Sequence, residues 1–196
     1  MMLQYVYYFN QFYFLGGLFI KSNKYIKYVL FSFLLILILG FAYFYYERNY
    51  TIAGILEKNG VSQEDIKLIF ESDNHFRYYL FDNDQEFGGI IALQKPSSRL
   101  TWSVYDRVIG SEQIESTEKG EWTKTSSTTY SDDQLHAFPV YGGRVKLLAS
   151  QELVFDSFNQ SFSPTLIKKI GNYTYFFLSE KSISLEDSVK IRIVNQ

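Results

Sequence analysis

The chain has 196 residues, two histidines, no cysteine and a formal net charge of −2 at pH 7. The absence of cysteine excludes disulfides, thiolate nucleophiles, iron–sulfur clusters and cysteine-ligated zinc. The residues after position 46 include 16 basic and 21 acidic side chains, a net charge of −5, so this part of the chain is not expected to bind nucleic acid, which needs Lys and Arg to neutralise phosphates.

Residues 1–27 are an apolar and aromatic N-terminal segment that ends in a lysine-rich flank. The stretch 5–20 has sixteen residues, which is marginal for crossing a bilayer, and polar and glycine residues interrupt it. Three interpretations stay open: a first transmembrane helix, an aromatic segment lying in the membrane interface, or an extension with little order.

Residues 28–46 form the strongest element, with no charged side chain and twelve residues of Leu, Ile, Phe or Val. As a helix the segment is roughly 28 Å long, close to the ~30 Å hydrocarbon core of a bilayer. Those twelve residues favour insertion by roughly 4–7 kcal/mol. Tyrosines at both ends suit the two membrane interfaces. The segment is predicted to be a transmembrane helix in contact with the lipid bilayer.

The lysines around this segment predict its orientation. Three lysines precede it, whereas Arg48 and Lys58 follow it. This bias places the lysine flank in the cytoplasm and residues 47–196 outside the membrane. A cleaved signal peptide is the rival interpretation, but the apolar run is long and no small-residue cleavage site follows it. An exported domain without cysteine is typical of a bacterial envelope protein.

The chain after the membrane segment begins with two predicted helices. Residues 49–59 are expected to form the first, which Gly60 would end. Ser62 is a candidate N-cap for a second helix that ends near Ser72, with Asp65 in the place of a capping-box acid. The apolar stripe of this second helix would be Ile66, Ile69 and Phe70.

From residue 75 onward the pattern predicts strands. Their expected ranges are 75–81, 87–93, 100–108, 112–115, 121–125, 135–141, 173–178 and 189–194. Residues 126–133 are predicted to be a polar loop, Pro139 favours an edge strand, and Gly142-Gly143 marks a break. Residues 144–153 favour a helix. Together these features predict an α+β fold, in which residues 47–196 are one antiparallel-sheet domain with a helix packed on one face.

The acidic run 82–86 has the beginning of a calcium-binding loop, with Asp82, Asp84 and Glu86 at alternate positions. The pattern then fails, because Phe87 stands where a glycine is needed and Leu93 stands where a bidentate Glu is needed. A hairpin turn is therefore the preferred interpretation. No metal site and no cofactor site are predicted.

Only one group of polar residues has the elements of a catalytic site. Asp132, Asp133 and His136 lie close together in sequence, next to serines in the predicted loop. A serine hydrolase needs a nucleophile, a histidine and an orienting acid in contact, and no Gly-x-Ser-x-Gly motif is present. The three residues are weak candidates for a hydrolase or transferase site, and a solvated loop is the preferred interpretation.

Two tryptophans are candidates for a sugar-binding groove. Trp102 falls on the apolar side of its predicted strand and is expected in the core, whereas Trp122 is flanked by polar residues and is the better candidate for an exposed contact.

The function expected from the sequence is thus a membrane-anchored envelope protein, non-enzymatic, that binds a protein partner or senses a ligand. The alternative is an anchored hydrolase or transferase that acts on envelope material.

Overall fold

The structure is a computed structural model that describes residues 24–72, 75–82, 86–96, 98–99, 101–114, 120–131, 134–158 and 160–195. By internal contacts the chain divides into two units, Met1–Glu47 and Arg48–Gln196, and each is described by itself. The apolar stretch 5–20, for which three interpretations were open, lies outside the described residues.

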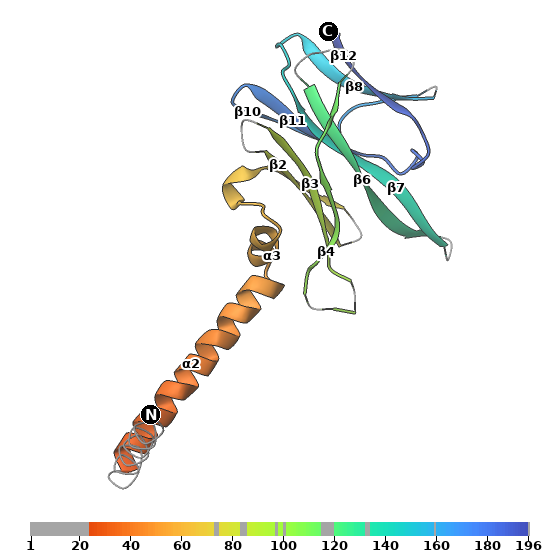
Figure 1. Ribbon diagram of the computed structural model, residues 1–196. Helices are drawn as coiled ribbons and strands as arrows, with labels where there is room; N and C mark the ends of the chain where they lie inside the picture. The colour runs from red at the N-terminus through yellow and green to blue at the C-terminus, as the bar shows by residue number, and fades with distance from the viewer. Residues whose placement is uncertain are drawn as a thin grey trace, which may run out of the picture. The chain divides into compact units, whose positions relative to one another are not determined.

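The first unit contains most of one long helix, α2 (Lys24–Tyr50), which is drawn in orange in Figure 1. It includes the whole of the predicted span 28–46, and none of its residues is buried. Apart from Ile26, its leucine, isoleucine and phenylalanine residues are each about half exposed or more. The helix is long and apolar enough to cross a membrane, a property that a signal sequence shares.

The helix predicted at 49–59 is two helices. α2 ends at Tyr50, and α3 (Ile52–Lys58) begins after Thr51, whose backbone is extended and whose Oγ1 accepts a hydrogen bond from the N–H of Gly54 at 3.1 Å. Threonine is a good N-cap because its hydroxyl pairs with an N–H group that the helix itself leaves free. Gly60 follows with a φ of +73°, which confirms the predicted stop.

Twelve strands in the described residues form three antiparallel sheets (Figure 1). The first sheet has the order β1-β2-β3-β4, the second β10-β11-β7-β6-β5 and the third β12-β8-β9. The strands are β1 (Ile66–Ser72), β2 (Phe76–Asp82), β3 (Phe87–Gln94), β4 (Ser103–Ile109), β5 (Glu112–Gln113), β6 (Gly120–Ser131), β7 (Gln134–Val145), β8 (Gln151–Ser157), β9 (Gln160–Phe162), β10 (Leu166–Ile170), β11 (Tyr173–Ser179) and β12 (Val189–Asn195).

The helix predicted from Ser62 to Ser72 is wrong. Ser62 does act as a cap, but only for a single 3₁₀ turn, η1 (Gln63–Asp65), and β1 follows at once. The apolar residues of β1 are at a spacing that also fits a helix, but β1 pairs with β2 along its length, with Phe70 opposite Tyr78. Strand pairing therefore overrides the local helical signal.

Further predictions for the segments of β6 and β7 are wrong. Within the polar loop expected at 126–133, residues 126–131 are the outer half of β6, and residues 132–133 lie outside the described residues. The pairing of β6 with β7 runs from Gly120 opposite Val145 to Ser131 opposite Gln134. Gly142-Gly143 does not break the chain but lies inside β7. The edge strand predicted from Pro139 is wrong, because β7 lies between β11 and β6. Pro139 is tolerated in this interior strand because β11 pairs with β7 only from Val140 onward. The helix expected at 144–153 is the end of β7 and the start of β8.

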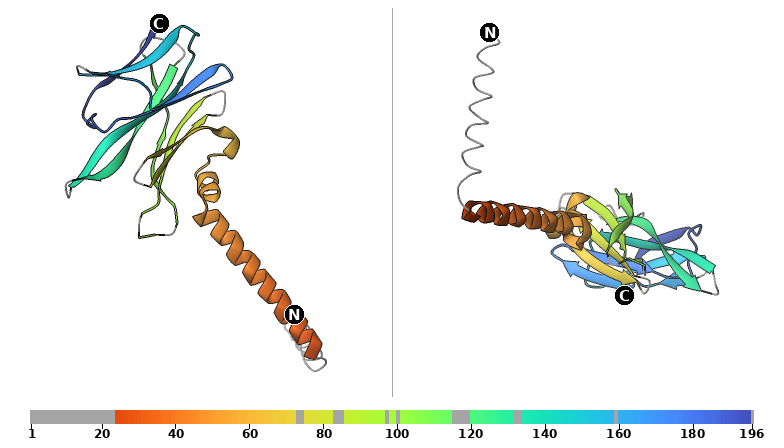
Figure 2. Two further views of the ribbon diagram at one scale, coloured as in Figure 1. Left: turned by 180° about the vertical axis from the view of Figure 1, so that it is seen from behind. Right: turned by 90° about the horizontal axis from the view of Figure 1, so that it is seen from below.

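The second sheet is the middle layer of the domain, as the views in Figures 1 and 2 show. One of its faces packs on the first sheet, in a core that includes Tyr78, Val140 and Phe177, and the other packs on the third, in a core that includes Tyr141, Phe155 and Phe176. Because both faces are buried, β11 is apolar at successive residues rather than at alternate ones.

The outer face of the first sheet carries the helix. Ile55 and Leu56 of α3 pack with Val61 on Tyr79 and Leu93. The expected helix on one face of a sheet therefore exists, but it is α3 and not the segment 62–72. The fold is a sheet-rich domain of three antiparallel sheets with few helices in the described residues, preceded by the apolar α2.

Candidate functional site

The weak catalytic candidates are not brought into a described site. Asp132 and Asp133 lie outside the described residues, and His136 is exposed on β7, opposite Thr129 of β6. Ser126 and Ser127, which were expected in the same loop, belong to β6. His136 therefore lies near the far end of the β6–β7 hairpin, along an extended pair of strands.

Asp82, the first of the three calcium candidates, is already engaged. It is fully buried at the end of β2, where it accepts hydrogen bonds from an arginine and a tyrosine. Asp84 lies outside the described residues and Glu86 is exposed. β2 and β3 are antiparallel neighbours, with Asp82 opposite Phe87, as the hairpin interpretation predicts. The described residues contain no group of three or more acids and histidines that could hold a metal ion.

The partner of Asp82 is Arg144 of β7, which joins the first sheet to the second. Nη1 of Arg144 donates to both carboxylate oxygens of Asp82, at 2.8 and 2.7 Å, and Nε donates to Glu121 at 2.8 Å. The Tyr175 hydroxyl donates to Asp82 at 2.7 Å, and the guanidinium lies 4.5 Å from the ring centroid of Tyr173. The carboxylates of Asp82 and Glu121 thus share one guanidinium.

This network is a structural clamp. The Arg144 side chain is 5% exposed and the Asp82 side chain is not exposed at all, and neither residue lines the pocket described below. A buried ion pair of this kind is stable only with complete partners, because both charges have lost water. The sequence contains no signal of it, since 62 residues separate the two partners.

A pocket of about 340 Å³ lies between the second and third sheets. Its walls come from the short β5 with the adjoining part of β6, and from β12 with the two residues before it. Residues 112–114 and 187–191 line it consecutively. Since side chains of a strand alternate between faces, a run of consecutive lining residues shows that strand edges, with their backbone groups, form these walls. Both β5 and β12 are edge strands.

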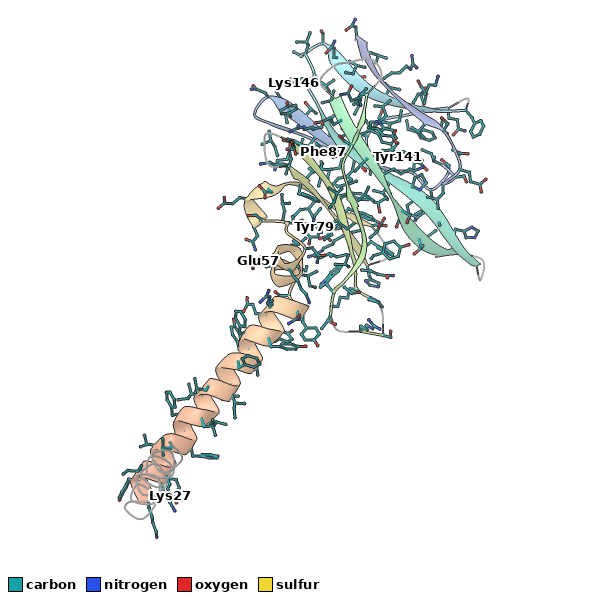
Figure 3. The ribbon with its side chains drawn as sticks, in the orientation of Figure 1. Lys27, Glu57, Tyr79, Phe87, Tyr141 and Lys146 are labelled. Carbon is teal, nitrogen blue, oxygen red and sulfur yellow. The ribbon has the colours of Figure 1, made fainter. Side chains whose placement is uncertain are left out.

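Tyr141 of β7 lines this pocket from the core and is labelled in Figure 3. The side chain is 1% exposed, and among the described residues no partner hydrogen-bonds its hydroxyl. Burial, together with the negative charge of the nearby Asp187, raises the pKa of Tyr141 to about 12. The phenol therefore stays protonated at neutral pH and offers both a donor and an acceptor. A buried hydroxyl without a partner is uncommon and needs an explanation.

The rim of the pocket carries charges of both signs. Glu112 and Asp187 are balanced by Lys124 and Lys190, so the rim has no net formal charge. Lys124 also donates a hydrogen bond from Nζ to the carbonyl of Leu185 at 3.4 Å, which joins β6 to the loop before β12. A strongly charged ligand has no electrostatic preference for such a rim.

Trp122 of β6 adds an aromatic wall to the pocket. It is half-buried, and its ring centroid lies 5.6 Å from that of Tyr141. Trp102 packs instead against the core beneath α3, with the Arg77 guanidinium 5.0 Å from its ring centroid. The two tryptophans thus occupy different environments: Trp122 lines the pocket, and Trp102 belongs to the core beneath α3. Sequence reasoning selected Trp122 but missed Tyr141, which stands in an apolar strand like an ordinary core residue.

The raised pKa of Tyr141 predicts a loss of stability in alkali. Below the unfolded-state pKa near 10 the phenol is neutral in both states, and above it only the unfolded chain is deprotonated until the pH reaches about 12. The free energy of unfolding should fall over this interval, by at most about 1.4 kcal/mol per pH unit from this group. Urea titrations at several pH values on wild type and Tyr141→Phe measure it, and equal slopes in the two proteins would contradict it.

Comparisons of this chain with protein-family models, with characterised proteins and with solved structures give no match.

Proposed function

We propose that the chain is a non-enzymatic binding protein, anchored in the cell membrane by α2, with the sheet domain outside the cytoplasm and the pocket at Tyr141 as its binding site. The observation that carries the anchor is the apolar surface of α2, in which no residue of a 27-residue helix is buried. A soluble protein rarely exposes so large an apolar surface, because water around it is unfavourable.

The orientation rests on the lysines near α2. Lys24 and Lys27 lie at its N-terminal end, after Lys21, and Arg48 is the one basic residue in its last turn. Positive charge is retained on the cytoplasmic side during insertion, which favours a sheet domain on the outer side. The binding role rests on the pocket, where a buried hydroxyl without a partner lines a space with mixed polar and aromatic walls.

Removal of the apolar segment is expected to release the domain from the membrane. All three cores are formed by residues after position 48, so a variant that lacks residues 1–46 keeps every buried cluster of the sheet domain. The full chain should remain in the membrane fraction after high-salt and carbonate washes, and the truncated chain should be soluble. Recovery of the full chain in the soluble fraction would contradict the anchor.

Two further measurements separate the alternatives. Mass spectrometry of the membrane-bound protein should find the N-terminal segment still attached, whereas a mature chain that begins after residue 46 would identify a signal peptide. Reporter enzymes fused to the C-terminus, one active only outside and one active only inside the cytoplasm, test the orientation. Activity of the cytoplasmic reporter alone would place the sheet domain inside and overturn that part of the proposal.

A further inference from the structure

We infer that the pocket at Tyr141 binds a neutral saccharide of one or two rings, an assignment that rests on the proposed binding role of this pocket. The volume of about 340 Å³ is at the small end of ligand pockets, which span roughly 300–1,000 Å³. The site must therefore hold a compact ligand, and its lining decides the chemistry of that ligand.

The floor of the pocket requires a ligand with hydrogen-bonding groups. The Tyr141 hydroxyl is buried and has no partner in the described part of the chain, so an apolar ligand would leave it unsatisfied. A sugar hydroxyl both donates and accepts, and so pairs with a neutral phenol in either direction. The raised pKa of Tyr141 keeps that phenol neutral over the physiological range.

The walls add two further requirements that a saccharide meets. Trp122 supplies an aromatic surface, and its negative face attracts the C–H groups that a sugar ring presents on its less polar side. Glu112, Gln113 and Asp187 supply acceptors, while Lys124 and Lys190 supply donors. Because the two acids and two lysines balance, neither a polyanion such as a phosphate chain nor a polycation is favoured over an uncharged ligand.

The strand edges also suit an extended peptide, which would add to β12 by backbone pairing, but the dimensions are against it. Only three residues of β12, Val189 to Ile191, line the pocket, which is roughly 10 Å of strand. β5 on the other side has two residues, and Lys124 bridges β6 and the loop before β12. A peptide strand needs a longer register of paired residues than these edges provide, whereas their backbone groups suffice for the hydroxyls of a saccharide.

The chain allows a direct optical test, because it has only two tryptophans. In the Trp102→Phe variant, Trp122 is the sole tryptophan, and its emission, excited at a wavelength where tyrosine does not absorb, reports on the pocket. The full chain is purified in a zwitterionic detergent without a sugar headgroup and titrated with glucose, N-acetylglucosamine, cellobiose and N,N′-diacetylchitobiose at millimolar concentrations. At least one of these saccharides is expected to change the Trp122 emission saturably.

Two tyrosine variants test the role assigned to the hydroxyl. Tyr141→Phe should weaken binding of the active saccharide about tenfold, as expected for one lost hydrogen bond, while its melting temperature stays equal to or above that of wild type, because no described residue hydrogen-bonds the removed hydroxyl. Tyr79→Phe is the matched control, since Tyr79 is a buried tyrosine in the core beneath α3 and is also labelled in Figure 3. It should bind like wild type.

Three results would overturn the inference. The first is no change of Trp122 emission with any of the four saccharides. The second is a response to an alternating threonine–valine octapeptide in place of the saccharides, which would leave the proposed binding role intact but assign the site to strand addition. The third is wild-type affinity in Tyr141→Phe. A failure of the proposed membrane anchoring would be detected separately, by the fractionation of the full and truncated chains.

Discussion

Substitution of Asp82 by alanine is expected to destabilise the sheet domain by about 3–5 kcal/mol, the usual effect of removing one partner of a buried ion pair. The Arg144 guanidinium would keep Glu121 but lose both of its bonds to the first sheet, and it is buried where water does not replace them. The Tyr175 hydroxyl would lose its acceptor as well. Such a loss is a large part of the stability of a domain of this size.

Urea unfolding followed by tryptophan fluorescence measures this effect in the full chain, because both tryptophans lie in the sheet domain and none in α2. Glu71→Ala is the matched control. The carboxylate that it removes pairs with Arg77 at the surface, and the Glu71 side chain is 60% exposed. A surface pair contributes about 0–1 kcal/mol, so this variant should unfold close to wild type.

A paired substitution distinguishes loss of the clamp from loss of charge alone. Changing Asp82 to leucine together with Arg144 to methionine removes both charges of the buried pair and keeps most of the volume, while the third charge, on Glu121, is partly exposed to water. Replacement of a buried ion pair by apolar residues is often neutral or stabilising, so the double variant should recover much of the stability lost in Asp82→Ala. If Asp82→Ala unfolds at the same urea concentration as Glu71→Ala, the clamp does not hold the two sheets together.

Gly143→Ala is expected to destabilise the domain by at least about 3 kcal/mol, at or above the upper end of the usual range for overpacking. A Cβ at this position would lie 2.2 Å from the carbonyl oxygen of Glu121 and 2.7 Å from Cζ of Phe176. The first of these atoms is backbone on the neighbouring β6, so it moves only if the β6–β7 pairing moves. Gly143 is paired on both sides, with Trp122 and Phe176.

Gly110→Ala is the control for this variant, because it separates backbone strain from steric overlap. Gly110 has a φ of +94° but no atom within 4 Å of its Cβ position. Alanine there should cost about 1–2 kcal/mol from conformation alone. The urea midpoints of unfolding compare the stability of the two variants. A smaller loss of stability in Gly143→Ala than in Gly110→Ala would show that β6 and β7 move apart at little cost in stability.

The strands and turns that the sequence predicted correctly are those with local causes. β2, β3, β11 and β12 have runs of β-branched and aromatic residues, and β12 alternates apolar residues with Lys190 and Arg192, which are exposed as expected. Gly60 and Ser62 also act as predicted, because the left-handed stop and the cap depend on one residue and its neighbours.

The errors have a common physical reason, since in each segment pairing or packing with another strand overrides the structure that its own residues favour. The residues of β1 fit a helical stripe, and only pairing with β2 makes them a strand. Gly142-Gly143 has the composition of a turn, but in β7 the missing side chains make room for Phe177 and Phe176 of β11. Residues 126–131 are polar, and they form a strand because β7 pairs with them along the hairpin.

The distinction between local causes and tertiary contacts also applies to the functional residues. The sequence by itself determined the uncharged apolar segment within α2, because hydropathy and length are local properties of consecutive residues. It also identified Trp122 as a candidate contact. Only the tertiary structure decided that Trp122 shares a pocket with Tyr141 and Asp187, and that Arg144 and Asp82 form a clamp between two sheets. Those groups come from β2, β6, β7 and the loop before β12, and the stacking of three sheets, which no local pattern encodes, brings them together.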